Sequence, residues 1–518
     1  MMRLRRRAPG LVVTLLLLLA LILWVSLSGR GGNFEDKYRG MDMDQAHGGI
    51  GRDNTYALYL KQHEGQPPGR DTIPVNLTDH NATGDAHLRQ EADGSQALYA
   101  GEGSDIRFRV SVPEAGMYQL RLRYLTLASR GVDMERKLYI NGEMPFLGAD
   151  TLVFTRMWTD AAAVRRDNQG NEIRPAQAEV FGWQTADFKD PMGYERAPYQ
   201  FYFKAGENEI RLVASSEPMV MGAFQLTPID TPLSYHEYAA QQAFEGPGPG
   251  DVLLDLPGEA AALRSSPSLY ARYDRSSPAT QPQDLHRVVL NYIGGDPWRI
   301  PGQWIEWEVE VPEDGFYQIT IKGRQRYQRG AKSSRTLLID GQVPFSELSE
   351  IPFEFGNAWE MKTLADEAGT PYDIYLEKGR HSLRLEATLG GMGQILTQLD
   401  DSVFRLNQMY RKILVLTGVN PDTFRDYNLH QVYPEVIEAM ALESRRLYLI
   451  VDETTAYTGQ KSDKIAAAQT LATQLEEFAR DPYRITSSFV NFKDNITALG
   501  TAMQAMGEIK LDIDSIYL

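Results

Sequence analysis

The feature that most constrains this chain is an internal repeat. The letters VPEAGMYQ at residues 112–119 return as VPEDGFYQ at residues 311–318, an offset of 199 positions (311 − 112). The same offset relates a further set of residues without a gap: Gly103 to Gly302, Arg130-Gly131 to Arg329-Gly330, Asn141-Gly142 to Asp340-Gly341 and Pro145-Phe146 to Pro344-Phe345. Register kept over roughly forty residues is not expected by chance, so the chain contains two copies of one domain.

Alternation of polar and apolar residues indicates what kind of domain is repeated. In Trp304–Val311, as in Ile106–Val110, every second side chain is apolar, which is the period of an extended strand. A proline, an acidic residue and a glycine then predict a turn before a second alternating run. The pairs Asn141-Gly142 and Asp340-Gly341 predict further hairpins. Short strands separated by turns predict a β-sandwich, or jelly roll, for each copy.

The two tryptophans of the strand at residues 304–311 are predicted to point to opposite faces, because they are three residues apart. Trp307 shares its face with Ile305 and Val309, so we expect it in the core. Trp304 shares its face with three glutamates, so we expect it to be exposed.

The order of these motifs is similar to that of carbohydrate-binding modules of families six and thirty-five. The residues that carry the resemblance are Tyr292-Ile293-Gly294-Gly295, Trp304–Val309, Val311-Pro312 with Gly315 and Tyr317, Leu338–Gly341, and the closing segments Phe203–Leu212 and Leu376–Leu385. The resemblance implies two sugar-binding sandwiches. It also implies that an aromatic residue before the closing strand helps to form the ligand cleft, and it is compatible with a structural calcium ion held by acidic residues of an early strand.

The N-terminus predicts export from the cell. Arginines precede Leu11–Leu27, a mostly apolar run that would reach about 25 Å as a helix, near the lower limit for a bilayer. The arginines favour a cytoplasmic N-terminus, which makes the chain a single-pass membrane protein with its bulk outside the cell. A cleaved signal peptide is the alternative, since Ser26-Leu27-Ser28 fits a cleavage site.

Beyond this segment the chain is predicted to be mainly β, with a helical end. Helical spacing of apolar residues starts at Ile395 and returns near residues 434–451, 462–480 and 485–506, which predicts an up-and-down bundle. An insertion at 164–178 is expected to be an exposed loop. The predicted layout is a signal anchor or transmembrane helix at 1–30, a stalk linker at 31–71, β-sandwich 1 at 72–227, a Gly/Pro linker at 228–254, β-sandwich 2 at 255–390, a helical bundle at 391–508, and at 509–518 the start of a further domain or a strand that pairs with a partner.

Composition and motifs exclude several classes of function. Without cysteine there are no disulfides, thiolate metal sites or cysteine nucleophiles. A net charge of −16 argues against nucleic acid as a partner. The nucleophile elbow, zinc-protease, P-loop and dinucleotide motifs are absent from the sequence, so we expect no enzyme and no cofactor beyond the calcium mentioned above. A pair of carboxylates for glycoside hydrolysis stays open, because the two partners can lie far apart in the chain.

The candidate ligand-binding residues come from positions that the two copies share. Trp183 and Trp359 precede the matched pairs Pro198-Tyr199 and Pro371-Tyr372 by 15 and 12 residues (198 − 183 and 371 − 359). Each is either a sugar-stacking ring or a cap on the core. The other candidates are Arg130 with Arg329, for which pairing with an acid is the competing interpretation, and Asn141 with Asp340, which turn geometry alone explains.

Anchor, two jelly rolls and bundle together resemble the N-terminal half of large membrane-anchored extracellular solute-binding proteins of Gram-positive carbohydrate ABC importers. The sequence therefore predicts an extracellular protein that binds polysaccharide or cell-wall glycan, with an ABC permease as an expected partner. Two alternatives remain open. A structural ectodomain would bury its tryptophans, and a glycan hydrolase would place two carboxylates in one cleft.

Overall fold

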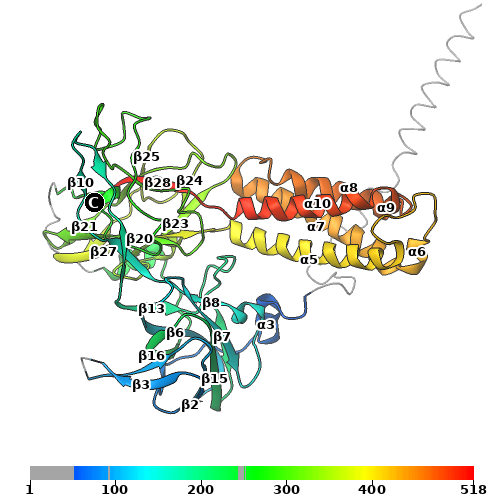
Figure 1. Ribbon diagram of the computed structural model, residues 1–518, viewed down its shortest axis with the longest axis horizontal. Helices are drawn as coiled ribbons and strands as arrows, with labels where there is room; N and C mark the ends of the chain where they lie inside the picture. Colours follow the sequence, from blue (N-terminus) through cyan, green and yellow to red (C-terminus); the bar gives the residue numbers. More distant parts are fainter. Residues whose placement is uncertain (1–51, 92–93, 243–249, 251) are drawn as a thin grey trace, which may run out of the picture. The chain divides into compact units, whose positions relative to one another are not determined.

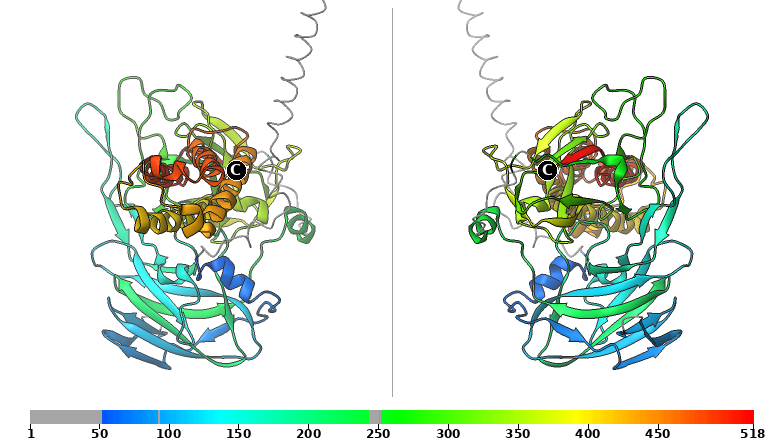
Figure 2. Two further views of the ribbon diagram at one scale, coloured as in Figure 1. Left: turned by 90° about the vertical axis from the view of Figure 1, so that its right-hand side faces the viewer. Right: turned by 90° about the vertical axis from the view of Figure 1, so that its left-hand side faces the viewer.

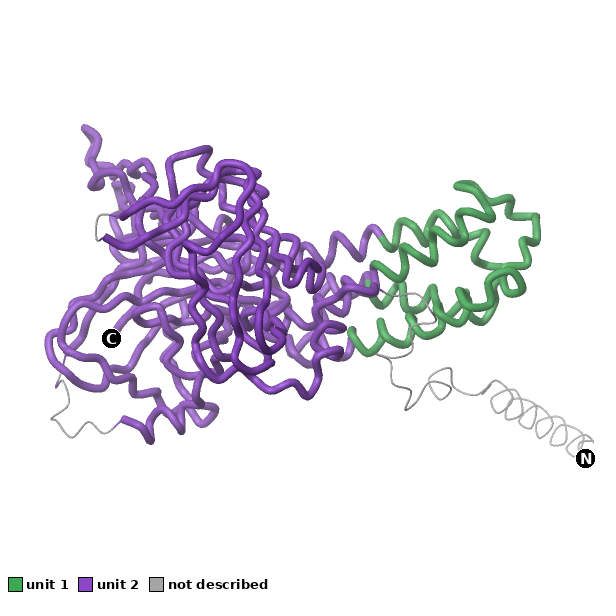
Figure 3. The backbone as a smooth tube through the Cα atoms, turned by 90° about the horizontal axis from the view of Figure 1, so that it is seen from below, with its two compact units in different colours: residues 1–51, 404–450, 468–496 green, residues 52–403, 451–467, 497–518 purple. Residues whose placement is uncertain are grey.

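The computed structural model (Figure 1) describes residues 52–91, 94–242, 250 and 252–518. They fall into two compact units (Figure 3): one comprises residues 404–450 and 468–496, the other residues 52–403, 451–467 and 497–518. The predicted anchor at 1–30 lies outside the described residues, as does most of the predicted stalk. Within the described part, no helix is both long and apolar enough to cross a bilayer.

The first sandwich consists of two antiparallel sheets, and Figure 2 shows its strands in two layers. One sheet has the order β13-β6-β16-β4-β3, with β1 beside β16 and β14 beside β6, and the other has the order β2-β5-β15-β7-β8. Their bounds are β1 Ile73–Val75, β2 His80–Thr83, β3 Ala86–Gln90, β4 Gln96–Ala100, β5 Asp105–Val112, β6 Gly116–Thr126, β7 Met134–Ile140, β8 Leu152–Phe154, β13 Trp183–Asp187, β14 Gln200–Phe203, β15 Gly206–Ser216 and β16 Met219–Thr227.

The predicted alternation places the core of this sandwich between the two sheets. On β5 the buried residues are Ile106, Phe108, Val110 and Val112, while the residues between them are exposed. Phe108 meets Phe224 of the opposite sheet with ring centroids 5.7 Å apart. Burying each such side chain stabilises the fold by about 1.5–3 kcal/mol.

The second sandwich repeats this plan. One sheet has the order β17-β28-β22-β25 with β19 beside β28, and the other has the order β12-β9-β18-β20-β27-β23-β24, while β21 pairs with β26. The bounds are β9 Met157–Asp160, β12 Gln177–Val180, β17 Asp255–Pro257, β18 Leu263–Arg264, β19 Ile293–Gly295, β20 Trp304–Val311, β21 Gly315–Tyr317, β22 Thr320–Arg324, β23 Ser333–Ile339, β24 Ile351–Phe353, β25 Glu360–Thr363, β26 Ile374–Leu376, β27 Gly379–Thr388 and β28 Leu511–Tyr517.

The C-terminal residues complete this second sandwich. We expected residues 509–518 to begin a further domain or to pair with a partner. Instead, β28 pairs within the chain, with β17 and β19 on one side and β22 on the other. β28 pairs with β22 in the same register as β16 pairs with β6. Ile516 lies opposite Ile321, and Phe224 lies opposite Leu122, the residue that matches Ile321 at the offset of 199 (321 − 122). The last strand of the second copy therefore follows the helices in sequence, and the bundle is an insertion between β27 and β28.

The helical insertion contains four long and two short helices: α5 Met392–Thr417, α6 Leu429–Val432, α7 Pro434–Thr458, α8 Ala466–Arg480, α9 Arg484–Ser487 and α10 Phe489–Met506. Parts of the four long helices make up the unit of residues 404–450 and 468–496. Its core includes ring contacts of Tyr410 with Phe489 and of Phe478 with Phe492. The helical periodicity did not reveal one feature of this core, a fully buried Glu443 that binds Arg405 at 2.6 Å.

The insertion at 164–178 in the first sandwich is largely exposed, as predicted, but it contains strands rather than a loop alone. Residues 157–180, which we call the arm, include β9, β12 and a small hairpin of β10 (Arg165–Arg166) and β11 (Glu172–Ile173). Arg264 of β18 pairs with Trp158 of β9, so the arm extends a sheet of the second sandwich. Asp160 holds the buried Arg264 guanidinium at 2.7 Å. The arm thus joins the two sandwiches through a shared sheet.

Trp307 is buried as predicted, but the expectation that Trp304 is exposed is wrong. Trp304 retains only 3% of its accessible surface. The Arg384 guanidinium carbon lies 3.8 Å from the Trp304 ring centroid. Glu386 is the cross-strand neighbour of Trp304, and Lys189 of the first sandwich binds Glu386 at 2.5 Å. The alternation correctly placed Trp304 on the outer face, and other parts of the chain then cover that face.

Two short helices precede the sandwiches and correct the predicted domain limits. In α3 (Tyr56–Gln62) the hydroxyls of Tyr56 and Tyr59 accept hydrogen bonds from the backbone N–H groups of Gln200 and Tyr202. In α4 (Tyr235–Gln241) those of Tyr235 and Tyr238 accept from Asp373 and Tyr375. Residues assigned to a stalk and a linker therefore belong to the sandwiches, and each copy begins with a helix that carries two tyrosines three positions apart.

Candidate functional site

Trp183 is part-exposed on the outer face of the first sandwich. It begins β13 and lies opposite Leu125 of β6. The Arg123 guanidinium carbon lies 4.4 Å from its ring centroid, a cation–π contact worth about 0.5–1 kcal/mol at an exposed site. Gly222 makes room for the ring, because a Cβ there would come within 2.8 Å of the indole. Gly222, which has no side chain, and Arg123 therefore hold the Trp183 indole at the surface.

A row of side chains crosses the five strands of this face. Direct cross-strand neighbours share a face, and the pairings connect, in order, His87 (β3), Tyr99 (β4), Val220 (β16), Leu125 (β6) and Trp183 (β13). Four strand spacings of about 4.8 Å make the row roughly 19 Å long. His87 is exposed and stacks on Tyr99 with ring centroids 4.7 Å apart, while Val220 in the middle is buried. The face thus presents aromatic groups at both ends.

Trp359 occupies the position of Trp183 in the second copy. Trp359 directly precedes Glu360 of β25, and Glu360 lies opposite Gly323. Trp359 therefore lies beside Arg324. Arg324 is the counterpart of Leu125 at the offset of 199 (324 − 125), and Leu125 is the residue opposite Trp183. The Arg324 guanidinium carbon is 4.2 Å from the Trp359 ring centroid. The indole N–H donates a 2.7 Å hydrogen bond to Thr280 Oγ1. The sequence comparison of Trp183 with Trp359 therefore identified equivalent positions.

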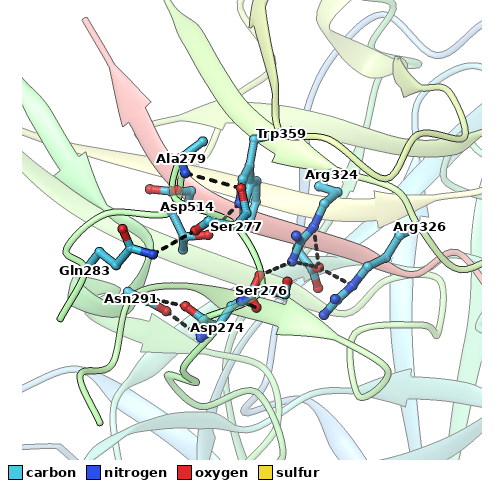
Figure 4. A network of polar contacts seen from close by, with 12 residues as sticks. Asp274, Ser276, Ser277, Ala279, Gln283, Asn291, Arg324, Arg326, Trp359 and Asp514 are labelled. Carbon is cyan, nitrogen blue, oxygen red and sulfur yellow. Dashed lines mark hydrogen bonds and ion pairs between the residues drawn. The ribbon is translucent and has the colours of Figure 1, made fainter. Parts of the chain in front are cut away.

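The surroundings of Trp359 are closed by the segment at residues 265–292, which we call the cover segment. Contacts from this segment reach the outer face of the sheet. Thr280 binds Trp359, the Ala279 carbonyl accepts from Lys322, and the Gln281 N–H donates to Asp514. Asp274 binds Arg324 at 2.8 Å (Figure 4). The Trp359 indole stays part-exposed, but its N–H is occupied by the cover segment and one face of its ring by Arg324.

A fully buried carboxylate takes the position of Val220 in the second copy. Asp512 lies 3.0 Å from Arg324 and 3.1 Å from Arg326, and it accepts a 2.6 Å hydrogen bond from the Tyr327 hydroxyl. Burial raises the pKa of Asp512 above its ordinary value, against the opposing pull of Tyr327 and the two arginines. These charges satisfy one another and leave the second sandwich with a closed, internally neutralised face.

Two acidic residues near this face, Asp514 and Glu259, are candidate ligands for the expected calcium ion. Asp514 Oδ1 and Glu259 Oε2 are buried without a hydrogen-bond partner, and burial raises the pKa of Glu259 to about 7. Lys322 Nζ already lies 3.0 Å from Asp514 and supplies a positive charge. Among the described residues, no cluster of three or more histidines and carboxylates is arranged to hold a metal. Calcium therefore stays a prediction.

Arg130 and Arg329 have different surroundings. Arg130 binds Glu217 at 2.8 Å and Glu102 at 3.0 Å, which is the acid pairing that competed with ligand binding. Glu217 is fully buried, so Arg130 neutralises a charge that would otherwise be costly. Arg329 is exposed, with its guanidinium carbon 5.9 Å from the Phe355 ring centroid.

Asn141 and Asp340 occupy matching hairpin turns with positive φ, 52° and 51°. Asn141 accepts a hydrogen bond from the Glu209 N–H, and Asp340 accepts from the Ser382 N–H. Both turns follow strands of the sheet opposite the tryptophans, β7 and β23. The structure therefore does not bring these two residues into one site with Trp183 or Trp359.

The sequence reasoning missed His87, Tyr99 and Arg123, which lie on the Trp183 face. Tyr99 alternates with buried Leu98 and Ala100 on β4, a signal that could have placed it outward. The pairing of β3 with β4 had no such signal. Also unforeseen was an open polar hollow of about 510 Å³ in the helical unit, lined by Thr470, Thr473, Gln474, Glu477, Asn491, Asp494 and Asn495.

Comparison with known structures finds matches of low identity and low TM-score. A Paenibacillus sp. cycloisomaltooligosaccharide glucanotransferase is 20% identical over 28% of this chain and 17% of its own, with a TM-score of 0.20. A Podospora anserina GH26-CBM35 β-(1,4)-mannanase is 15% identical over 31% and 28%, with a TM-score of 0.19. A family 35 carbohydrate-binding module from Clostridium thermocellum is 15% identical over 30% and 98%, with a TM-score of 0.18. The chain thus spans under a third of the first two proteins, and at these TM-scores the likenesses say nothing about its ligand.

The helical region gives the more specific match. None of the curated proteins compared with this chain matches it. Residues 394–515, however, match the family model of the four-helix bundle domain of bacterial solute-binding proteins. The match runs from α5 into β28, so it covers the insertion in the second sandwich together with most of the strand that closes it. The predicted likeness to bacterial solute-binding proteins is thereby confirmed for this part of the chain.

Proposed function

We propose that this chain is a membrane-anchored extracellular protein that binds polysaccharide or cell-wall glycan, and that it serves a carbohydrate ABC importer. The observation that carries the sugar-binding part is the row from His87 to Trp183 on the first sandwich. Aromatic faces offer contact area at a low cost in side-chain entropy. Arg123 beside Trp183 adds a polar group that can fix the orientation of a sugar hydroxyl.

The transport part of the proposal is supported by the bundle, because residues 394–515 match a domain of bacterial solute-binding proteins. An ABC permease is the corresponding partner. The N-terminal arginines and the apolar run Leu11–Leu27 support a single membrane pass with the sandwiches outside the cell. The net charge of −16 disfavours nucleic acid as a partner.

We further propose that the chain binds its glycan without chemical turnover and without a cofactor. A glycoside hydrolase needs two carboxylates roughly 5–10 Å apart in one open cleft. On β13, which carries Trp183, the carboxylate of Asp187 is bound to Arg121 at 2.6 Å. The ion pair with Arg121 already engages this carboxylate.

A structural role is the second candidate, and the second sandwich favours it there. Trp298, Trp304 and Trp307 are buried to 3% exposure or less, as expected for a protein-contact scaffold. Trp359 is part-exposed as Trp183 is, but its indole N–H is already bound to Thr280 of the cover segment. We therefore assign glycan binding to the first sandwich and a supporting role to the second.

The test is affinity electrophoresis of the full chain in detergent micelles through gels that contain neutral polysaccharides chosen from a glycan array. Trp183→Ala is expected to lose retardation by roughly tenfold or more, because the stacking surface is gone. Trp359→Ala is the matched control and should be retarded like the wild type. Equal loss in both variants, or no retardation of the wild type on any glycan, would refute the assignment.

A further inference from the structure

A second cluster, away from the Trp183 row, lies where the arm meets the cover segment. Three hydrogen bonds join the arm to the cover segment: the Glu172 N–H donates to the Val288 carbonyl (2.8 Å), the Val288 N–H donates to Asn171 Oδ1 (2.9 Å), and the Leu290 N–H donates to Glu172 Oε2 (2.8 Å). The residue that follows β11, Arg174, is thereby held against a defined part of the second sandwich.

Two arginines from these segments converge on one tyrosine. The Arg174 guanidinium carbon lies 3.6 Å from the Tyr270 ring centroid, and that of Arg272 lies 5.6 Å from it. Partial burial would raise the pKa of Tyr270, but the hydrogen bonds and charges of Arg272 and Arg174 outweigh it and hold the pKa below its usual value. The phenol hydroxyl thus lies in the positive field of both guanidinium groups.

Neither arginine has a carboxylate partner within 4.0 Å among the residues that the structure describes. The acids in the surroundings already have partners: Glu172 binds Arg166, and Asp512 binds Arg324 and Arg326. Arg174 is exposed, while Tyr270 and Arg272 are part-exposed. In a chain of net charge −16, two adjacent cations without a counterion form a local positive site. At physiological ionic strength charges more than about 8 Å away are largely screened, so charges farther off contribute little at this site.

We propose that Arg174, Tyr270 and Arg272 bind an anionic group, a carboxylate or a phosphate, carried by the saccharide that the chain captures. This inference rests on the proposed function for the nature of the carrier. Guanidinium groups suit such ligands, because their planar forks donate two parallel hydrogen bonds to a carboxylate or phosphate. The Tyr270 hydroxyl provides a further donor at the same point. Because Arg174 belongs to the arm, the site exists only when the arm lies on the cover segment.

The experiment measures binding of polygalacturonate, a carboxylate polymer, to the full chain in detergent micelles, with inorganic phosphate as a competitor. Arg174→Gln and Arg272→Gln are each expected to weaken binding roughly tenfold or more, because each removes a charge-assisted hydrogen bond. Arg165→Gln removes an equal charge from an exposed position of the same arm and should change binding less than twofold. Arg174 is exposed, so its variant should keep the wild-type melting curve even if Arg272→Gln is less stable.

Displacement of polygalacturonate by phosphate would extend the site to phosphate groups, and a lack of displacement would restrict it to carboxylates. An equal loss in Arg165→Gln would overturn the proposal, since the binding would then depend only on overall charge. Absence of binding to both polygalacturonate and phosphate would also overturn it. Neither result touches the Trp183 assignment, which is decided with neutral polysaccharides and with Trp183→Ala.

Discussion

The two sandwiches share one strand plan, yet their equivalent outer faces differ. In the first, the connection from Ala82 to Leu98 has 15 residues (98 − 82 − 1) and forms β3 at the edge of the sheet. In the second, the connection from Arg264 to Ile293 has 28 residues (293 − 264 − 1) and supplies the contacts that close the face. The repeated strands therefore set the fold, whereas the length of one connection decides whether the face is open to a ligand.

The largest expected effect concerns the buried charge that replaces Val220 in the second copy. Asp512→Ala should destabilise the second sandwich by about 3–5 kcal/mol, because it leaves Arg324 and Arg326 without their shared carboxylate. Urea unfolding followed by tryptophan fluorescence measures it. Val220→Ala, the matched change in the first sandwich, should cost only about 2 kcal/mol from lost apolar burial. If Asp512→Ala costs no more than Val220→Ala, the charge cluster does not stabilise the closed face.

Next in size is a change that displaces the exposed indole. Gly222→Ala puts a Cβ within 2.8 Å of Trp183, so the ring must shift at a cost of about 1–3 kcal/mol, and glycan binding should fall by a similar free energy. Gly356→Ala is the control, because no atom lies within 4 Å of its added Cβ. Affinity electrophoresis on the same polysaccharide measures both variants. Unchanged binding by Gly222→Ala would separate the ligand site from Trp183.

A smaller effect is expected from loosening the cover segment. Thr280→Val removes the acceptor of the Trp359 indole N–H and should cost about 1 kcal/mol. Fluorescence quenching by acrylamide should rise as Trp359 becomes more accessible. Thr185→Val on exposed β13 is the control and should leave quenching unchanged. Identical quenching in both variants would mean that this hydrogen bond does not hold the cover segment.

The smallest expected effect is a pH dependence that comes from one contact, which titrates in the second sandwich but not at the matching place in the first. Burial alone would lower the pKa of His381, but hydrogen bonds to Asp340 (2.6 Å) and to the Glu377 carbonyl (2.7 Å) outweigh it and raise the pKa above 6.5. A histidine whose pKa is raised on folding stabilises the folded state below pH 6.5. This stabilisation is lost as the pH rises through the pKa of the histidine in the folded state. Because solvent screens the exposed Asp340, we expect this contact to contribute under about 1 kcal/mol to the free energy of unfolding.

The matching contact in the first sandwich joins Asn141 to Asn208, neither of which titrates. Melting curves of His381→Asn between pH 5 and 8 should therefore lose the part of the wild-type pH dependence that His381 contributes, while the part from Glu259, whose pKa lies at about 7, remains. A wild-type curve that does not change over this range would contradict the prediction for His381.

Local alternation predicted much of the fold but not its long-range pairing. The strands, the turns at Asn141 and Asp340 and the equivalence of Trp183 with Trp359 follow from patterns within each copy. The strand pattern of residues 511–517 was also visible, but its partners lie across an inserted bundle and pairing leaves no local signal. The Tyr56 and Tyr235 helices were missed because their offset is 179 (235 − 56) rather than 199.

The candidate site was predictable only in part, because a side chain's face is a local property and its exposure is not. Alternation placed Trp304 on the outer face, but Arg384 of a neighbouring strand and Lys189 of the other sandwich determine what covers that face. In the same way, nothing near Trp359 in the sequence indicates that the cover segment closes over it. Tyr99 and His87 join Trp183 only through the sheet order.

The most direct test of an open first face and a closed second face is amide hydrogen exchange of the full chain in detergent micelles, with and without a neutral polysaccharide that it binds. The account predicts slower exchange on addition of the glycan in β4, the end of β6 and β13, with no change in β25 or the cover segment. Slower exchange confined to β25 and the cover segment would contradict it and would move the glycan site to the second sandwich.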